Sequence, residues 1–443
     1  MKPRKPESSP YEDLFRMKLE QLINQRHELC RLARVIDWQR CEAQFGALYA
    51  EDGRPGIPVR LMVGLHYLKH AFNESDETVV ARWVENPYWQ YFCGEEYFSH
   101  RPPIDPSQMT RFRQRIGESG CEWMLGLTVR AGLDTHTVKR SSLSVVNVDT
   151  TVQEKAIAFP TDARLYHKAR LTLVRHAQQL NIALRQSYTR VGKLALAKQG
   201  RYANAKQMNR AKREQRKLRT YLGRIIRDIE RKASAEQLAC LARLLNLAKR
   251  IHQQQRKDHG KVYSVHASEV ECIAKGKAHK RYEFGVKVGI VSTSKESFVI
   301  GMQALPGNPY DGHTLAGSLE QVQRITGLLP TEAYVDRGYK GHGITTLSVW
   351  IAGAKRGVTA AIKRKLKRRN AIEPVIGHLK SDGRLSRNHL KGELGDAMNA
   401  LLCGAGHNLR KILNRLRLFC ARRNLDFIAL LHALCWRRLS LNF

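Results

Sequence analysis

The chain has 443 residues, of which 42% are hydrophobic, enough apolar material for two or three domains with cores. It carries 76 lysines and arginines against 40 acidic residues, a formal net charge of +36. Such an excess repels itself in a compact chain unless a polyanion neutralises it, which favours nucleic acid as the partner. A membrane is the weaker alternative, because no run approaches the roughly 18 apolar residues that a spanning helix needs.

The nine cysteines are dispersed singly, without a Cys-x-x-Cys pair or a Cys/His cluster at zinc spacing. We therefore expect reduced thiols in a cytoplasmic protein rather than disulfides or a zinc site. The first residues, Met1 to Lys5, lead into acidic residues rather than into the apolar core of a signal peptide. This pattern also favours the cytoplasm.

The first 140 residues are predicted to be helical. Apolar spacing indicates a helical segment over residues 1–57, which a turn cluster at residues 52–58 closes. A second helical domain is predicted at residues 58–140. Its helices are expected at residues 59–71, 78–84 and 108–115, and the last of them carries Arg111, Arg113 and Arg115. Short helices that end in an arginine-rich helix are typical of a helix-turn-helix-like DNA-binding domain. The alternative is a helical bundle with a solvated basic face.

From residue 141 the pattern changes to that of a mixed α+β domain. The apolar, β-branched run at residues 143–149 predicts a buried strand. Further elements are expected as strands at 282–291, 297–305 and 332–336, a helix at 314–325, and helices from about residue 366. We assign residues 141–161 and 260–420 to this domain, and residues 421–443 to a C-terminal helical tail.

Residues 162–259 are predicted to form a long, basic helical insertion in that domain. Residues 162–257 hold about 25 lysines and arginines and about 5 acids. The clusters Lys212-Arg213 and Arg216-Lys217 predict phosphate contacts that do not depend on DNA sequence. A solvated face or a protein–protein contact is the alternative.

Three acidic residues stand where a metal site would need them. Asp149 and Asp336 end apolar strands, and a buried carboxylate at a strand end normally meets a cation. Glu373 follows in a helical region. Three carboxylates without cysteine or histidine suit two Mg²⁺ ions, with Mn²⁺ as a substitute, and such pairs of ions catalyse phosphoryl displacement. The alternative is that the two aspartates only cap turns.

Basic residues flank Glu373. Arg369 and Lys380 lie four residues before it and seven after it, so that on one helix all three share a face. Pro374 favours the first turn of a helix, which predicts that a helix starts or kinks at Glu373. The two cations are expected either to hold a DNA strand at the site or to pair with Glu373.

The segment around Glu373 resembles the signature of bacterial insertion-sequence transposases, Tyr-x2-Arg-x3-Glu-x6-Lys. Arg369, Glu373 and Lys380 match it, whereas Leu366 stands at the tyrosine position. Asp149-Thr-Thr151 and Asp336-Arg-Gly-Tyr339 resemble the first and second motifs of that family. Three longer strings resemble the branch named after insertion sequence 5, and the similarity covers about residues 40 to 415. The strings lie at residues 263–277, 282–287 and 372–380.

The resemblance implies a ribonuclease-H-like catalytic core, a mixed sheet that carries the two aspartates and a following helix that carries the glutamate. It implies that Asp149, Asp336 and Glu373 hold two divalent ions. The enzyme would hydrolyse double-stranded DNA at the terminal inverted repeats of its element, and the freed 3′-hydroxyl would attack target DNA. We expect a homodimer or a higher oligomer on DNA, in the bacterial cytoplasm at the nucleoid.

Other DNA-cutting classes fit less well. A tyrosine recombinase needs a tyrosine downstream of a His-x-x-Arg pair, but the last tyrosine, Tyr339, precedes His407-Asn-Leu-Arg410. A rolling-circle nuclease needs a His-hydrophobic-His motif, which the chain lacks. A catalytically inactive or domesticated transposase that only binds DNA stays open as the alternative.

Overall fold

The computed structural model describes residues 17–439 except 51–55, 256, 275–280 and 354–358, with side chains described up to residue 418. Part of the predicted turn cluster at residues 52–58 lies outside the described residues. The chain divides into two compact units. The first comprises Met1–Gln153, Lys287–Leu390 and Leu394–Phe443, and the second comprises Glu154–Val286 and Lys391–Glu393.

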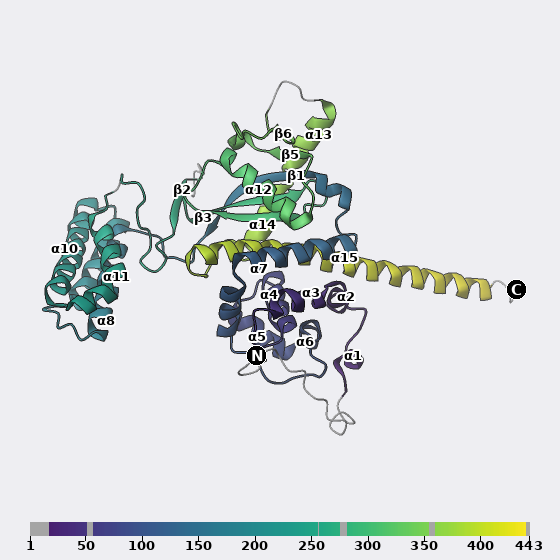
Figure 1. Cartoon of the computed structure of the whole chain (residues 1–443), viewed down its shortest axis with the longest axis horizontal. Helices are drawn as coiled ribbons and strands as arrows, with labels where there is room; N and C mark the ends of the chain where they lie inside the picture. Colours follow the sequence, from purple (N-terminus) through teal and green to yellow (C-terminus); the bar gives the residue numbers. More distant parts are fainter. Residues whose placement is uncertain (1–16, 51–55, 256, 275–280, 354–358, 440–443) are drawn as a thin grey trace. The chain divides into compact units, whose positions relative to one another are not determined.

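The N-terminal part of the first unit is helical, as expected (Figure 1). Its helices are α1 (Leu19–Leu22), α2 (Glu28–Val35), α3 (Trp38–Gly46), α4 (Val59–Ala71), α5 (Asp76–Glu85), α6 (Pro87–Cys93) and α7 (Ser107–Asp134). Helix α4 is apolar on nearly all sides and is buried along almost its whole length. A capping box of Ser75 and Thr78 starts α5. Helix α7 is interrupted at Gly117, whose φ of +64° is readily adopted only by glycine.

The chain also forms a mixed sheet, most of whose strands belong to the first unit; β2 and the residues of β3 up to Val286 belong to the second. The strands are β1 (Val145–Glu154), β2 (Glu271–Ala274), β3 (Tyr282–Thr293), β4 (Val299–Leu305), β5 (Glu332–Val335) and β6 (Ser348–Ile351). Their order is β2-β3-β1-β5-β6, and β4 also pairs with β3. Strand β5 runs parallel to β1 and to β6, whereas β3 is antiparallel to β2 and β4. The short strands β2 and β6 were not among the strands expected from the sequence.

Helices cover both faces of this sheet. Helix α12 (Asp311–Thr326) packs on one face, where a Cβ on Gly289 of β3 would lie 3.3 Å from the Ser318 hydroxyl. Helix α15 (Gly392–Leu439) contacts the other face, and its Asn408 side chain bonds the backbone N–H and C=O of Val299 in β4. The 3₁₀ segments η1 (Arg140–Ser144) and η2 (Arg337–Tyr339) precede β1 and follow β5, and α13 (Ala360–Arg369) and α14 (Ile372–Ser381) lead to α15.

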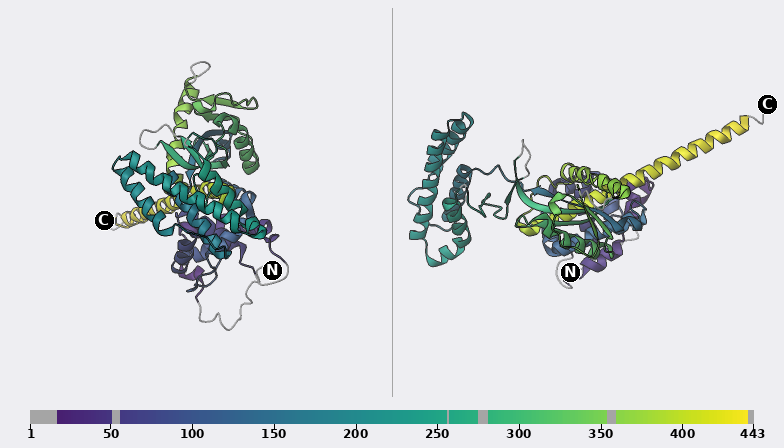
Figure 2. Two further views of the ribbon diagram at one scale, coloured as in Figure 1. Left: turned by 90° about the vertical axis from the view of Figure 1, so that its left-hand side faces the viewer. Right: turned by 90° about the horizontal axis from the view of Figure 1, so that it is seen from above.

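The second unit consists mainly of helices, which Figure 2 shows from two further sides. They are α8 (Asp162–Gln179), α9 (Thr189–Asn204), α10 (Met208–Lys232) and α11 (Ala235–Gln253). Leu173, Leu222, Ile229 and Ile251 belong to one apolar core that these helices share. The unit therefore has a core of its own, with most of its charge on the outside. Among the described residues of either unit, no helix is both long and apolar enough to cross a bilayer.

Candidate active site

Two of the three expected acidic residues belong to neighbouring parts of the sheet: Asp336 directly follows β5, whereas Asp149 lies inside β1 and does not end it as expected, because the strand continues to Glu154. The parallel register of β1 and β5 pairs Val145 with Glu332 and Asn147 with Tyr334. Asp149 and Asp336 each follow the last of these pairs by two residues, so the same register brings both carboxylates to one edge of the sheet. The backbone fixes both side chains: Asp149 Oδ1 accepts a hydrogen bond from the N–H of Thr150 at 2.7 Å, and Asp336 Oδ1 accepts one from Gly338 at 2.8 Å.

Glu373 lies in the first turn of α14, with Pro374 beside it where a missing N–H costs no helical hydrogen bond. The predicted helix start is therefore confirmed. The predicted shared face is wrong, because α13 ends at Arg369 and α14 begins at Ile372, so that Arg369 and Glu373 stand on different helices. The Glu373 side chain is exposed and has no ion-pair partner in the part of the chain that the structure describes.

Arg369 pairs with Asp149 rather than with Glu373. Its Nη1 lies 3.3 Å from Asp149 Oδ2, and the two side chains are only 11% and 16% exposed. The last residue of α13 is thus tied to β1, four residues before Glu373. Lys380, at the other end of α14, is half-buried and belongs to the last turn of that helix. The expectation that both cations pair with Glu373 does not hold for Arg369.

A fourth carboxylate, Asp311 at the start of α12, was not among the expected site residues. Asp311 Oδ1 lies 3.1 Å from the Thr150 hydroxyl, which donates to it, and 3.1 Å from Lys287 Nζ. A Cβ placed on Gly338 would lie 2.9 Å from Asp311 Oδ2 and 3.0 Å from Asp336 Oδ1, so the two carboxylates flank one point. A sequence signal for it was Lys287, the one charged residue of the run at residues 284–291.

Tyr339 lies directly after Asp336-Arg-Gly338 and is only 1% exposed. The Thr314 side chain of α12 hydrogen-bonds its hydroxyl. Burial raises the pKa of Tyr339, and the negative charges of Asp149, Asp311 and Asp336 raise it further. The Tyr339 hydroxyl is therefore protonated at ordinary pH.

The donor chemistry fits a hard divalent cation. Carboxylate and hydroxyl oxygens are what Mg²⁺ prefers, and no cysteine or histidine contributes to the group described above. Within the described ranges, however, no three acidic, histidine or cysteine side chains already stand in a metal-binding arrangement. Asp149 is engaged by Arg369, and Glu373 points its carboxylate to solvent, so a metal ion would have to draw these side chains together.

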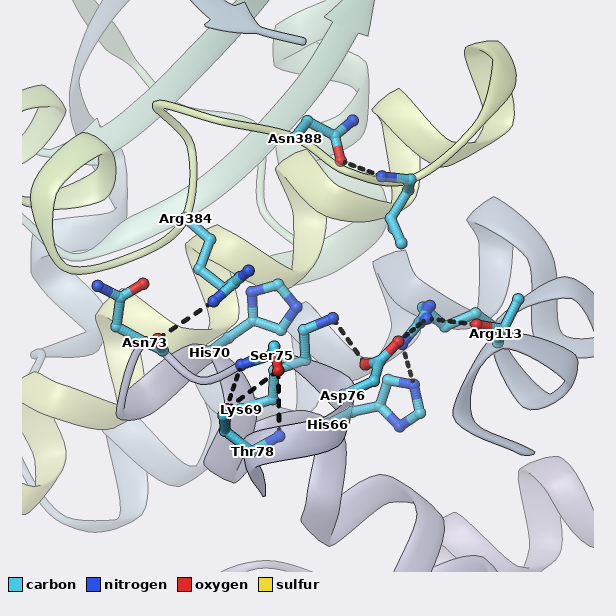
Figure 3. Close-up of polar contacts among 12 residues, drawn as sticks. His66, Lys69, His70, Asn73, Ser75, Asp76, Thr78, Arg113, Arg384 and Asn388 are labelled. Carbon is cyan, nitrogen blue, oxygen red and sulfur yellow. Dashed lines mark hydrogen bonds and ion pairs between the residues drawn. The ribbon is translucent and has the colours of Figure 1, made fainter. Parts of the chain in front are cut away.

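The N-terminal arginines do not share one exposed face, in contrast to the expectation from the sequence. Arg111 and Arg115 are exposed, and the Arg115 guanidinium lies over the ring of Tyr49 at 5.6 Å. Arg113 is 1% exposed and forms a double hydrogen-bonded ion pair with Asp76 of α5 (Figure 3). Its guanidinium is occupied inside the helical domain, so it does not reach a DNA phosphate in this structure.

Two further groups surround the Arg113–Asp76 pair. Lys69 Nζ lies 2.8 Å from Asp76 Oδ1, and His66 Nε2 lies 3.2 Å from Arg113 Nη1. Burial and the neighbouring Arg113 together lower the pKa of Lys69 to about 8. Burial and Arg113 likewise lower the pKa of His66, to about 3, so His66 is neutral at ordinary pH. This buried network joins α4, α5 and α7.

The four basic residues singled out in the insertion, Lys212, Arg213, Arg216 and Lys217, are all exposed on α10. Lys217 donates to Glu214 at 2.7 Å, which offsets its charge. The other three are placed so that a phosphate backbone could reach them. Their contacts with DNA phosphates stay a prediction.

Comparison with known proteins agrees with part of this description. Residues 17–115 match the model of a family described as a transposase domain (DUF772). The chain is 57% identical over 207 residues to "Uncharacterized protein ORF8 in nfe locus" of Rhizobium meliloti; the matched region is 47% of this chain and 100% of that protein. No solved structure matches the chain.

Proposed function

The chain belongs to a transposase family, and from this premise we propose that it is a DDE-type DNA transposase that cuts and joins DNA at the ends of its own element. The observation that supports this most is the placement of Asp149 and Asp336 side by side at one edge of the sheet. The Glu373-bearing helix follows α13, whose Arg369 contacts Asp149. In this proposal, three separate parts of the sequence supply the acids of one site.

The proposed core is ribonuclease-H-like. Supporting features are a central strand, β1, with β3 on one side and the parallel strand β5 on the other, and α12 between β4 and β5 on one face. The proposed branch is that of insertion sequence 5, on the strings that resemble it. The helices up to α7 are the proposed DNA-binding part, because the transposase-domain match lies there and Arg111 and Arg115 are exposed.

Asp149, Asp336 and Glu373 are the residues that would hold divalent ions, two Mg²⁺ or Mn²⁺. When bound, such ions stabilise the charge that develops on the attacking and leaving oxygens of a phosphodiester during in-line displacement. Orienting the metal-binding carboxylates is the role of the chain itself. The backbone N–H groups of Thr150 and Gly338 hold the two aspartates in fixed orientations.

Arg369 has two roles in this proposal. It holds Asp149 in place, and it brings a buried positive charge to the edge where a DNA phosphate would enter. Lys380 would contact the strand farther along α14 as a point charge. The exposed cations of the insertion, Lys212, Arg213 and Arg216, would add contacts to the backbone of double-stranded DNA at a distance from the cut. A homodimer or higher oligomer would bring two element ends together.

The test is nicking of a labelled duplex that spans the end of the element encoding the chain, in Mg²⁺ buffer. Glu373→Gln should abolish nicking and leave duplex binding within about twofold, because Glu373 is exposed and carries no structural ion pair. Glu332→Gln is the matched control, since Glu332 lies on β5 in an ion pair with Lys365 and should keep full nicking. Nicking by Glu373→Gln at the wild-type rate would remove Glu373 from the site.

A catalytically inactive transposase would give a different result. The wild-type chain would then bind the element end without cutting it in Mg²⁺ or Mn²⁺, and the Glu373→Gln variant would behave in the same way. Cutting by the wild-type chain excludes this alternative.

A further inference from the structure

The helical second unit contains a pocket of about 690 Å³ between helix α10 and the loop that joins α8 to α9. Its volume lies within the range of about 300–1,000 Å³ that is usual for small-ligand sites. All of its lining residues belong to the second unit, so that unit forms the pocket alone. Four of them are arginines: Arg185, Arg224, Arg227 and Arg231.

The two acidic side chains that line the pocket are already bonded to other groups. Asp228 Oδ2 accepts a hydrogen bond from the backbone N–H of Arg185 at 2.7 Å, and its Oδ1 lies 3.3 Å from Arg231 Nη2. Glu230 Oε1 lies 2.6 Å from Lys249 Nζ. These contacts engage both carboxylates, so the other arginine side chains of the pocket receive no counter-charge from its walls.

Arg224 and Arg227 are the two arginines best placed to bind an anion. Both are exposed, and neither has an ion-pair partner in the part of the chain that the structure describes. They stand three residues apart on α10, so their side chains share one face of the helix. A guanidinium can bond two oxygens of one phosphate, so this pair suits the sugar–phosphate backbone of a nucleic acid.

An aromatic ring stands beside these arginines. Tyr188 lines the pocket and stacks on Tyr221 of α10, with the ring centroids 4.7 Å apart and the ring planes inclined by 12°. The Tyr188 hydroxyl accepts a hydrogen bond from Arg224 Nη1 at 3.3 Å, so both the ring and the hydroxyl are fixed. A fixed aromatic ring next to basic side chains is the usual platform for an unpaired base, which stacks on the ring while its phosphates meet the cations.

A buried arginine supplies an independent observation. Arg170 of α8 is 0% exposed, and its Nη1 donates to the carbonyl of Ser187, which lies between two residues that line the pocket. Its Nε and Nη2 are buried without a hydrogen-bond partner, and within the described ranges no carboxylate pairs with it. A buried cation without a counter-charge is costly and normally meets an anion. The loop that frames the pocket therefore carries positive charge that the described chain does not balance.

We propose that this pocket binds an unpaired nucleotide of a single DNA strand. Arg224 and Arg227 bind its phosphates, and its base stacks on Tyr188. A base inside a duplex is paired and stacked, so it does not reach a side chain in a pocket. The inference goes beyond the proposed function, because it needs neither the acidic residues nor a metal ion. It also gives the insertion a second kind of DNA contact, besides the duplex contacts of the exposed cations farther along α10.

The experiment is fluorescence anisotropy of a labelled single-stranded oligothymidylate with the full chain, in buffer that contains EDTA. The double variant Arg224→Gln, Arg227→Gln should bind this strand about tenfold more weakly, and its salt slope should fall by about 0.7 for each lost phosphate contact. Tyr188→Leu should weaken binding by at least about fivefold, because the stacking contact is lost. Tyr188→Phe keeps the ring and should bind like the wild-type chain.

Two controls separate the pocket from general charge. The double variant Lys193→Gln, Lys198→Gln removes the same charge from exposed positions on α9 outside the pocket, and its affinity for the single strand should stay within about twofold of wild type. The pocket variants should likewise keep their affinity for a duplex within about twofold. Circular dichroism of each variant identifies a change in binding that comes from misfolding.

The inference would be overturned if the wild-type chain did not bind the single strand, or if the double arginine variant or Tyr188→Leu bound it with wild-type affinity. An equal loss in the lysine variant, or an equal loss on single strand and duplex, would also overturn it, because general charge would then explain the binding. Cleavage in Mg²⁺ buffer tests the proposed function separately, since these measurements contain no divalent ion.

Discussion

The first unit contains two groups of buried charges that are built in opposite ways. In the helical domain, the carboxylate of Asp76 is surrounded by cations: Lys69 and Arg113 both bond Oδ1, and Arg113 also bonds Oδ2. At the sheet, the negative charges of Asp149, Asp311 and Asp336 all raise the pKa of the buried Tyr339. There Asp336 is held only by a backbone N–H among the described residues.

The difference indicates what each group is for. A buried carboxylate that is fully bonded to cations holds helices together. Replacing either the carboxylate or one of its cations therefore lowers the stability of the fold. A group of carboxylates with too few cations is costly in the folded chain and is retained where a ligand supplies the missing charge. We therefore expect variants of the first group to affect stability, and variants of the second to affect cation binding and cleavage.

The largest expected loss of stability is at Asp76. Asp76→Asn would leave Arg113 and Lys69 buried without a counter-charge, and breaking a buried ion pair in this way costs about 3–5 kcal/mol. The matched control is Glu122→Gln, because Glu122 pairs with the exposed Arg324 and should cost less than about 1 kcal/mol. Urea unfolding followed by tryptophan fluorescence measures both. Equal midpoints for the two variants would mean that the Asp76 network does not hold the domain.

The pH dependence of stability should follow from the same residue. Burial raises the pKa of Asp76, but the hydrogen bonds from Arg113 and the charges of Lys69 and Arg113 outweigh it, so the pKa falls below its ordinary value of 3.8. A depressed pKa contributes stability that is present above pH 3.8 and is lost as the pH falls toward the lower folded value. Part of the acid unfolding of the wild-type chain should therefore come from Asp76.

Thermal unfolding between pH 6 and pH 2.5 tests this. The difference in melting temperature between the wild-type chain and Asp76→Asn should shrink as the pH falls, because protonated aspartate and asparagine are alike in charge. A constant difference over this range would show that Asp76 does not titrate with a depressed pKa.

The smallest expected effect concerns the exposed arginines of α7. Replacing Arg111 and Arg115 with glutamine should lower the salt slope of duplex binding by about 0.9 for each lost phosphate contact. Arg40, which is exposed and paired with Asp37, is the control and should leave the slope unchanged when replaced. Fluorescence anisotropy at salt concentrations from about 50 to about 200 mM measures the slope. A wild-type slope in the double variant would place the DNA contacts elsewhere.

The sequence predicted the parts of this picture that depend on short segments. The apolar run before Asp336 correctly predicted a strand that ends just before it, and Pro374 correctly predicted that a helix begins beside Glu373. The run before Asp149 predicted a strand correctly but not its end, because β1 continues through Asp149 to Glu154. Helix α4 was predicted with its observed bounds, because its apolar residues are continuous and Pro58 precedes them.

What the sequence did not predict depends on contacts between distant residues. Arg113 is buried because Asp76, 37 residues earlier, reaches it, and helical spacing alone gives an arginine on that face no partner. Asp311 resembles an ordinary acidic residue at a helix start until Lys287 and Gly338 are brought beside it. The partner of Arg369 was misjudged for the same reason, since Asp149 is 220 residues away and Glu373 only four.

The central claim is that the acidic group at the sheet edge acts in cleavage and does not serve the fold, and Asp336→Asn tests it most directly. Asp336 has no cation partner among the described residues, so its replacement relieves repulsion and should leave the unfolding midpoint equal to or above that of the wild-type chain. The same preparation, mixed with the labelled element end in Mg²⁺ buffer, should bind the duplex and give no nicked product. Wild-type nicking by this folded variant would contradict the account.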